Sequence, residues 1–131
     1  MMRMKILLEV FAIIALLMTA NIASADWVRY ADNEDGDDFY LDPATIRREG
    51  HIRIVWEIQD FKRRDSLGEL SRRGLREYDC KQQRLRSLSI TFHSERMGKG
   101  KVLYSSNATS EWNYFPPGSA SAIALRLLCA K

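Results

Sequence analysis

The chain has 131 residues, of which 46% are hydrophobic and 28% charged, and its formal net charge at pH 7 is +3. It contains no internal repeat and no low-complexity tract, which excludes repeat architectures and long disordered tails. No linker divides it, and its length suffices for one domain with one hydrophobic core.

The first 25 residues have the pattern of a secretory signal peptide. Two basic residues precede an apolar run over residues 10–18, and Ala23-Ser24-Ala25 forms an A-x-A cleavage site. We therefore expect cleavage of residues 1–25 before Asp26, which leaves an exported domain of residues 26–131 in the periplasm, on the cell surface or secreted. The alternative is a retained membrane anchor, but the run is shorter than the roughly 20 residues that a span needs. The mature protein is therefore expected to have no membrane span.

Cys80 and Cys129 are the two cysteines of the chain. Because an exported protein enters an oxidising compartment, two cysteines in it most simply form one disulfide. Such a bridge would close a loop of about 50 residues and contribute roughly 4 kcal/mol to stability. The alternative is a catalytic thiol.

Short strands are expected at residues 27–30 and 39–41, on either side of an acidic loop over residues 32–38. Asp42 then precedes Pro43, which is typical of a capped turn or a single helical turn. The loop does not fit an EF-hand calcium site, because alanine would occupy its first ligand position.

Residues 51–60 give the clearest strand pattern in the chain. Ile52, Ile54, Trp56 and Ile58 alternate with polar residues, and Val55 is the one exception. An alternation of this length predicts that the isoleucine side faces the core.

Residues 75–92 are predicted to form a hairpin around which the domain is organised. Residues 61–74 are polar and glycine-containing and are interpreted as a loop or a ragged strand extension. Strands 75–80 and 84–92 are joined by a polar turn, and their alternation separates a covered face from a solvent face. The covered face would carry Tyr78, Cys80, Leu88, Ile90 and Phe92, and the solvent face Glu77, Asp79, Ser87, Ser89, Thr91 and His93.

A glycine-rich turn at residues 97–100 leads to a predicted strand at 101–104, and residues 112–115 form a short strand or a packed loop. Ser119 is the expected N-cap of a helix over residues 120–130, apolar nearly all round, which must be buried against the sheet.

The fold class is therefore α+β, with a single antiparallel sheet of about five to six strands and a C-terminal helix packed on one face. Cys129 lies on the flank of the apolar sector of this helix. From that position it can reach the hairpin strand, which predicts a Cys80–Cys129 disulfide.

Charge is distributed unevenly along the mature chain. Residues 26–49 hold eight acidic residues against three arginines, whereas residues 62–86 hold nine basic residues against four acidic ones. Either the two blocks neutralise one another, within the fold or across a dimer, or they present a two-signed surface to a partner. The candidate binding surface for a polyanion such as lipopolysaccharide or glycosaminoglycan consists of Arg63, Arg64, Arg72, Arg73, Arg76 and Arg84.

Nucleic acid is not an expected partner of an exported protein whose net charge is +2 once the charges of residues 1–25 are removed. The two histidines, His51 and His93, are isolated in sequence and do not indicate a metal site. No catalytic, phosphate-binding or redox motif occurs, so we expect no cofactor and no enzymatic activity.

A set of residues in a fixed order spans residues 27–129. In order along the chain it comprises Trp27, Tyr40–Arg47, Gly50, Trp56, Ser66-Leu67, Asp79-Cys80, Arg84–Arg86, Met97–Gly100, Trp112, Pro117–Ser119 and Cys129. This set resembles the surface-adhesin protein E family of small exported bacterial proteins. The resemblance implies an antiparallel sheet with a helix against it, closed by the Cys80–Cys129 disulfide.

The resemblance also implies a Gram-negative source and binding to host extracellular proteins. The chain departs from the family's namesake, which is lipid-anchored, in having no cysteine near its cleavage site. The sequence therefore predicts an exported, non-catalytic, adhesin-like module that binds extracellular matrix or other host proteins, or polyanions. The alternatives are a periplasmic or envelope protein with a structural or scavenging role, and a small hydrolase or inhibitor whose site is assembled from scattered residues.

Overall fold

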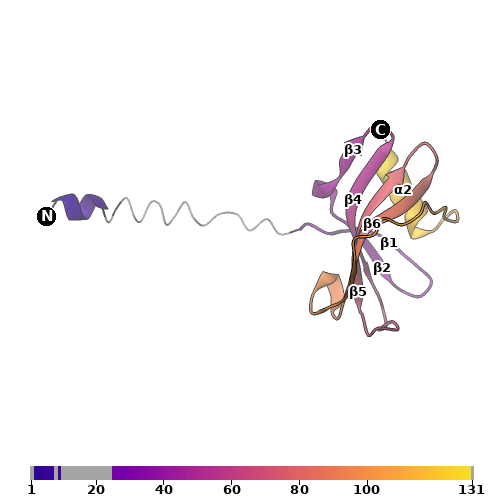
Figure 1. Cartoon of the computed structure of the whole chain (residues 1–131), viewed down its shortest axis with the longest axis horizontal. Coiled ribbons are helices and arrows are strands. Elements are labelled where there is room, and N and C mark those ends of the chain that lie inside the picture. Colours follow the sequence, from indigo (N-terminus) through magenta and orange to yellow (C-terminus); the bar gives the residue numbers. More distant parts are fainter. Residues whose placement is uncertain (1, 8, 10–24, 131) are drawn as a thin grey trace.

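The computed structural model describes residues 2–7, 9 and 25–130 (Figure 1). Most of the predicted signal peptide, including its apolar run and the first two residues of its cleavage site, lies outside the described residues. In the part that is described, no helix has both the length and the apolar character of a membrane span.

Residues 25–130 form one antiparallel sheet with a helix on it. The strands are β1 (Val28–Asp32), β2 (Asp38–Leu41), β3 (Arg47–Glu49), β4 (Ile52–Asp60), β5 (Ser71–Asp79), β6 (Arg84–His93) and β7 (Val102–Ser106). The helix is α2 (Ala120–Cys129), and two short 3-10 helices are η1 (Pro43–Thr45) and η2 (Arg96–Gly98).

The strand order is β1-β2-β4-β5-β6-β7, and β3 pairs with β4 on the same side as β2. β4 therefore has two partners along one edge, β3 beside its start and β2 beside its end. The seven strands exceed the predicted five to six because of β3, whose sequence Arg47-Arg48-Glu49 is charged and exposed. Such a strand has no apolar alternation and is formed by pairing with β4 alone.

The predicted hairpin is confirmed as β5 and β6, but β5 begins at Ser71 rather than at Leu75. A register shift between Leu75 and Arg76 leaves Leu88 without a partner in β5. Because of this bulge, Ser87 pairs with Arg76 and lines a cavity beside α2. The prediction that Ser87 faces solvent on the far side was wrong, since strict alternation does not hold across a bulge.

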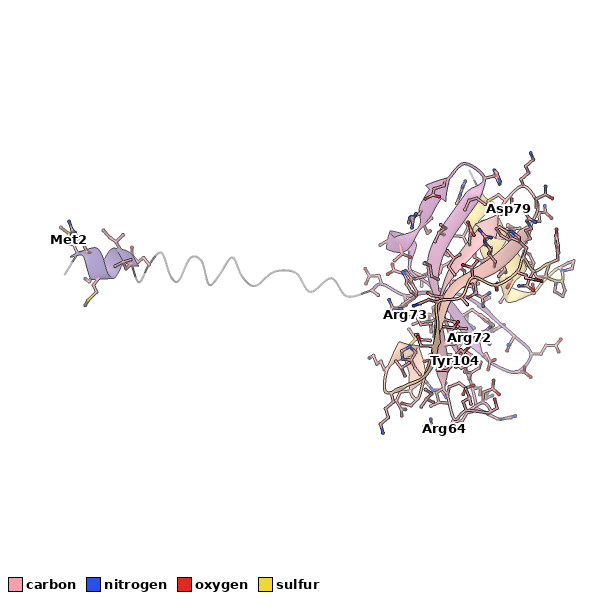
Figure 2. All side chains as sticks on the ribbon, viewed as in Figure 1. Met2, Arg64, Arg72, Arg73, Asp79 and Tyr104 are labelled. Carbon is pink, nitrogen blue, oxygen red and sulfur yellow. A yellow bond between two sulfur atoms is a disulfide. The ribbon has the colours of Figure 1, made fainter. Side chains whose placement is uncertain are left out.

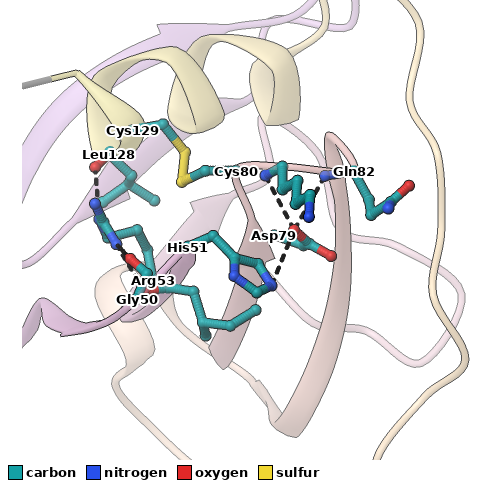
Figure 3. The surroundings of a disulfide bond; sticks show 10 residues. Gly50, His51, Arg53, Asp79, Cys80, Gln82, Leu128 and Cys129 are labelled. Atoms are coloured by element: carbon teal, nitrogen blue, oxygen red, sulfur yellow. Dashed lines mark hydrogen bonds and ion pairs between the residues drawn. A yellow bond between two sulfur atoms is a disulfide. The ribbon is translucent and has the colours of Figure 1, made fainter.

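Asp79 closes the turn of this hairpin (Figure 3). Its Oδ1 accepts the backbone N–H groups of Lys81 and Gln82, both at 3.0 Å, and its Oδ2 accepts Arg84 Nε at 3.1 Å. Burial opposes ionisation of this carboxyl group, but the hydrogen bonds from Gln82, Arg84 and Lys81 outweigh it. The pKa of Asp79 is consequently held below its usual value.

We predict that Asp79 contributes to acid sensitivity. A depressed pKa in the folded state means that stability is full at neutral pH and is lost as the pH falls through about 4 and below. The free energy of unfolding of Asp79→Asn, measured by urea denaturation, should therefore be lower at pH 7 and vary less between neutral and acid pH. Equal pH slopes for the variant and the natural protein would contradict this role.

The helix covers one face of the sheet, here called the helix face. Val55, Tyr78 and Leu85 on the strands pack with Ala124 and Leu128 of α2 in one buried cluster. Val55 and Tyr78 are completely buried. The isoleucine side of β4 is buried at Ile54 and Ile58, as predicted, but it does not face the helix. Val55, the exception to the alternation, is the β4 residue that packs against α2.

The opposite side, here called the open face, is covered only at one end. There η2 lies across β4 and β5, with Gly98 against Ile58 and the Met97 N–H donating to Asp60 Oδ1 at 2.7 Å. Each face of the sheet is thus covered over part of its length. This explains why β4 has buried side chains on both the helix face and the open face.

The Cys80–Cys129 disulfide is confirmed and joins the end of β5 to the last turn of α2, with the two Cα atoms 5.7 Å apart (Figure 3). Beside it, Arg53 Nε donates to the carbonyl oxygen of Leu128 at 3.1 Å. Ser119 caps the helix start as predicted, since its Oγ accepts the N–H of Ala122 at 3.2 Å.

Candidate functional site

The six arginines predicted as one binding surface lie in three separate regions. Arg63 and Arg64 are exposed in the loop between β4 and β5, and Figure 2 shows Arg64 at the end of the domain far from Asp79. Arg64 Nη1 donates to the carbonyl oxygens of Ser94 at 2.7 Å and Gly68 at 3.0 Å, so it is engaged in holding loops. The other four divide between the two faces of the sheet.

Arg73 and Arg84 are on the open face, where each guanidinium lies over a tryptophan ring. Arg73 Cζ is 4.6 Å from the ring centroid of Trp56. Arg84 and its neighbour Arg86 both lie over Trp112, at 4.4 Å and 4.3 Å. Cation–π pairs at exposed sites contribute about 0.5–1 kcal/mol each.

Carboxylates hold two of these arginines in place. Asp79 pairs with Arg84, and Glu77 pairs with Arg86 through its Oε2. Arg73 is different: it is exposed, and among the residues that the structure describes it forms no ion pair within 4.0 Å. Two of these three arginines are therefore paired with carboxylates, and the charge of Arg73 is uncompensated.

Three residues of this surface were missed by sequence reasoning: Trp56, Arg86 and Trp112. The i, i+2 spacing of Arg84 and Arg86 on one strand is a signal that places both on one face. Trp112 has no such signal. It reaches the arginines because its neighbour Asn113 forms a two-way backbone bridge with Leu85, 28 positions earlier in the chain.

Arg72 and Arg76 lie on the helix face, within a buried polar cluster centred on Glu57. Glu57 Oε1 accepts the Tyr30 hydroxyl at 2.8 Å, and Oε2 accepts the Tyr78 hydroxyl at 2.9 Å. Arg76 Nε lies 3.5 Å from the same carboxylate. Burial, reinforced by the charge of Glu57, raises the pKa of both Tyr30 and Tyr78. Both phenols are therefore neutral donors at physiological pH.

The two histidines lie at opposite ends of β5. His51 Nε2 is 3.8 Å from Asp79 Oδ1, beyond the end of β5, whereas His93 pairs with Ser71 at its start. Burial, and then the charge of Arg73, lower the pKa of His93. Across residues 2–7, 9 and 25–130, no cluster of three or more histidine, cysteine or acidic side chains is arranged to hold a metal ion.

The fold and the open face define a small disulfide-linked α+β domain with an arginine- and tryptophan-lined surface. Residues 27–130 match the family model of surface-adhesin protein E. The chain therefore belongs to the surface-adhesin protein E family, as its sequence resemblance indicated. Membership places it among adhesin-like proteins that are exported or surface-exposed.

Solved structures with this fold include Haemophilus influenzae protein E. Its crystal form II has a TM-score of 0.60 and 15% identity, covering 83% of this chain and 90% of that one. The selenomethionine form has a TM-score of 0.62 and 16% identity, covering 83% and 88%. Protein E from non-typeable H. influenzae has a TM-score of 0.52 and 15% identity, covering 84% and 78%. At this identity the likeness shows the fold alone, and no curated protein matches the sequence.

Proposed function

We propose that the protein, exported after cleavage before Asp26, is a non-catalytic adhesin-like module whose open face binds acidic groups of host extracellular proteins or polyanions. The observation that carries this proposal is the set of arginines stacked on Trp56 and Trp112. Family membership supports the adhesin-like role.

Arginine and tryptophan are the residue types most enriched at the energetic centres of protein interfaces. Stacking on the rings restricts the guanidinium groups before a ligand arrives, so less side-chain entropy is lost on binding. Arg73 is the residue best placed to bind an acidic group, because it is exposed and forms no ion pair among the described residues.

The proposal predicts that the protein is retained on immobilised heparin and on immobilised extracellular-matrix extract. Arg73→Ala should lower the affinity for heparin by about 1 kcal/mol, or about fivefold, the effect typical of an interface residue that matters. Retention should also weaken as salt is added, because exposed charges are screened. Elution salt and surface plasmon resonance would measure both effects.

Arg126→Ala provides the matched control, since Arg126 is an exposed arginine on α2 and its loss changes the net charge equally. A site on the open face requires Arg73→Ala to weaken binding more than Arg126→Ala does. Equal effects of the two variants would mean that only net charge matters, and would remove the open face as the binding site.

A further inference from the structure

A small cavity of about 40 Å³ lies on the helix face next to the first turn of α2. Arg72, Arg76, Gln59 and Ser121 are among the residues that line it. Arg72 and Ser121 also line two wider grooves that adjoin it. The cavity has room for a group of a few atoms, and the grooves would accommodate the remainder of a ligand.

Arg72 brings an unpaired positive charge to this cavity. Arg76 is already paired with Glu57, but the Arg72 guanidinium has no hydrogen-bond or ion-pair partner within the described part of the chain. Burial, and then repulsion from Arg76, lower the pKa of Arg72 to about 10, so it remains charged at neutral pH. The nearby Asp37 carboxylate is occupied by N–H groups of Asn33, Gln59 and Lys62.

Gln59, which also lines this cavity, has an unsatisfied acceptor. Its side chain is 8% exposed, and its Oε1 is buried without a hydrogen-bond partner among the described residues. The orientation of the amide is fixed, because Nε2 donates to Asp37 Oδ2 at 3.0 Å. An unpaired buried acceptor costs about 1–3 kcal/mol, and native proteins rarely leave one unpaired.

The first turn of α2 supplies further donors. The first N–H groups of a helix have no partner within the helix, and they carry partial positive charge. The Ser119 Oγ takes only the N–H of Ala122. Ser121 lies in this first turn and lines the cavity, so the positive end of the helix and Arg72 act on the same space.

We propose that this cavity binds a carboxylate that carries a hydroxyl or amino group on the adjacent carbon. The carboxylate would accept hydrogen bonds from Arg72 and the first turn of α2, while the adjacent donor would satisfy Gln59 Oε1. A phosphate ion fits less well, because it offers mainly acceptors to a site that also presents an acceptor. This binding activity is separate from the open face, since Arg72 and Arg73 point to opposite faces of β5.

The test compares lactate with propionate, which differ only in the 2-hydroxyl group. NMR titration of the purified ¹⁵N-labelled protein would follow the Gln59 side-chain amide and the Gly74 and Ser121 backbone signals. We expect lactate and alanine to bind about tenfold more tightly than propionate, the effect of one well-formed hydrogen bond in a charged site. Gluconate, a sugar acid with a hydroxyl group on the carbon next to its carboxylate, distinguishes a sugar acid from a smaller free acid as the preferred source of the carboxylate.

Arg72→Met should abolish saturable lactate binding, whereas Arg73→Met, the adjacent arginine on the opposite face, should leave it unchanged. Arg72→Lys should retain part of the affinity because it keeps the charge. Equal changes in the NMR chemical shifts on addition of lactate, propionate or matched sodium chloride would overturn the proposal. Lactate binding that survives in Arg72→Met would overturn it as well. The comparison of ligands needs no variant, so it remains decisive if Arg72→Met fails to fold.

Discussion

Replacing both disulfide cysteines, as Cys80→Ser with Cys129→Ser, is expected to lower the free energy of unfolding by about 4 kcal/mol. The bridge joins residues 49 positions apart, and cross-linking a loop of this length restricts the unfolded chain strongly. At about 4–8 °C per kcal/mol for a domain of this size, the melting temperature should fall by roughly 15–30 °C. Circular dichroism during thermal and urea denaturation would measure both quantities.

The effect should be concentrated in α2. Of its ten residues only Ala124 and Leu128 are buried, and Leu127 is 53% exposed, so the helix has a small apolar contact with the sheet. Hydrogen exchange should therefore be faster along α2 in the double variant than along β4 or β5. Adding a reductant provides an independent check. It should destabilise the natural protein, whose disulfide it breaks, and leave the double variant unaffected. A loss of stability below about 1 kcal/mol would show that packing alone holds the helix.

Features with a local signal were predictable from the sequence. The Ser119 cap, the α2 bounds and the β5–β6 turn follow from residue types at fixed short spacings. The disulfide followed from export, from the count of two cysteines and from the position of Cys129 on the helix. These predictions needed no knowledge of which distant residues meet.

The inward face of β4 was not predictable in the same way. Its helix-facing residues include Glu57 and Gln59. Because both are polar, an alternation pattern predicts that they face solvent. They can be buried because partners far along the chain satisfy them: Tyr30 and Tyr78 for Glu57, and Asp37 for Gln59. A buried polar group can be recognised only when its partners are known.

The candidate site was predicted in composition but not in arrangement. The arginines cluster in sequence, yet the alternation of β5 sends Arg72 and Arg76 to one face and Arg73 to the other. A stretch of basic residues in a strand therefore makes two surfaces rather than one. The pairing of Trp112 with Arg84 depends on a bridge between distant segments, for which the sequence carries no local signal.

Removing the carboxylate of Glu57 should destabilise the fold strongly. Its two oxygens accept the hydroxyls of Tyr30 and Tyr78 and face Arg76, and the residue is 6% exposed. Glu57→Ala would leave two phenol donors unsatisfied and the Arg76 charge buried without its partner. We expect the free energy of unfolding to fall by about 3–5 kcal/mol, the usual cost of removing one member of a buried ion pair. Urea denaturation at pH 7 would measure it.

Glu49→Ala is the matched control for this prediction. Glu49 also pairs with an arginine, with its Oε1 2.7 Å from Arg47 Nη2, but both side chains are more than half exposed. An exposed pair contributes only about 0–1 kcal/mol, so this variant should be close to neutral. Glu57→Gln should fall between the two, because its amide oxygen can still accept one tyrosine hydroxyl while the charge opposite Arg76 is gone. If Glu57→Ala lowered the free energy of unfolding no more than Glu49→Ala does, the buried polar cluster would contribute little to the stability of the helix face. The Arg72 cavity, which adjoins this cluster, would then have no rigid wall.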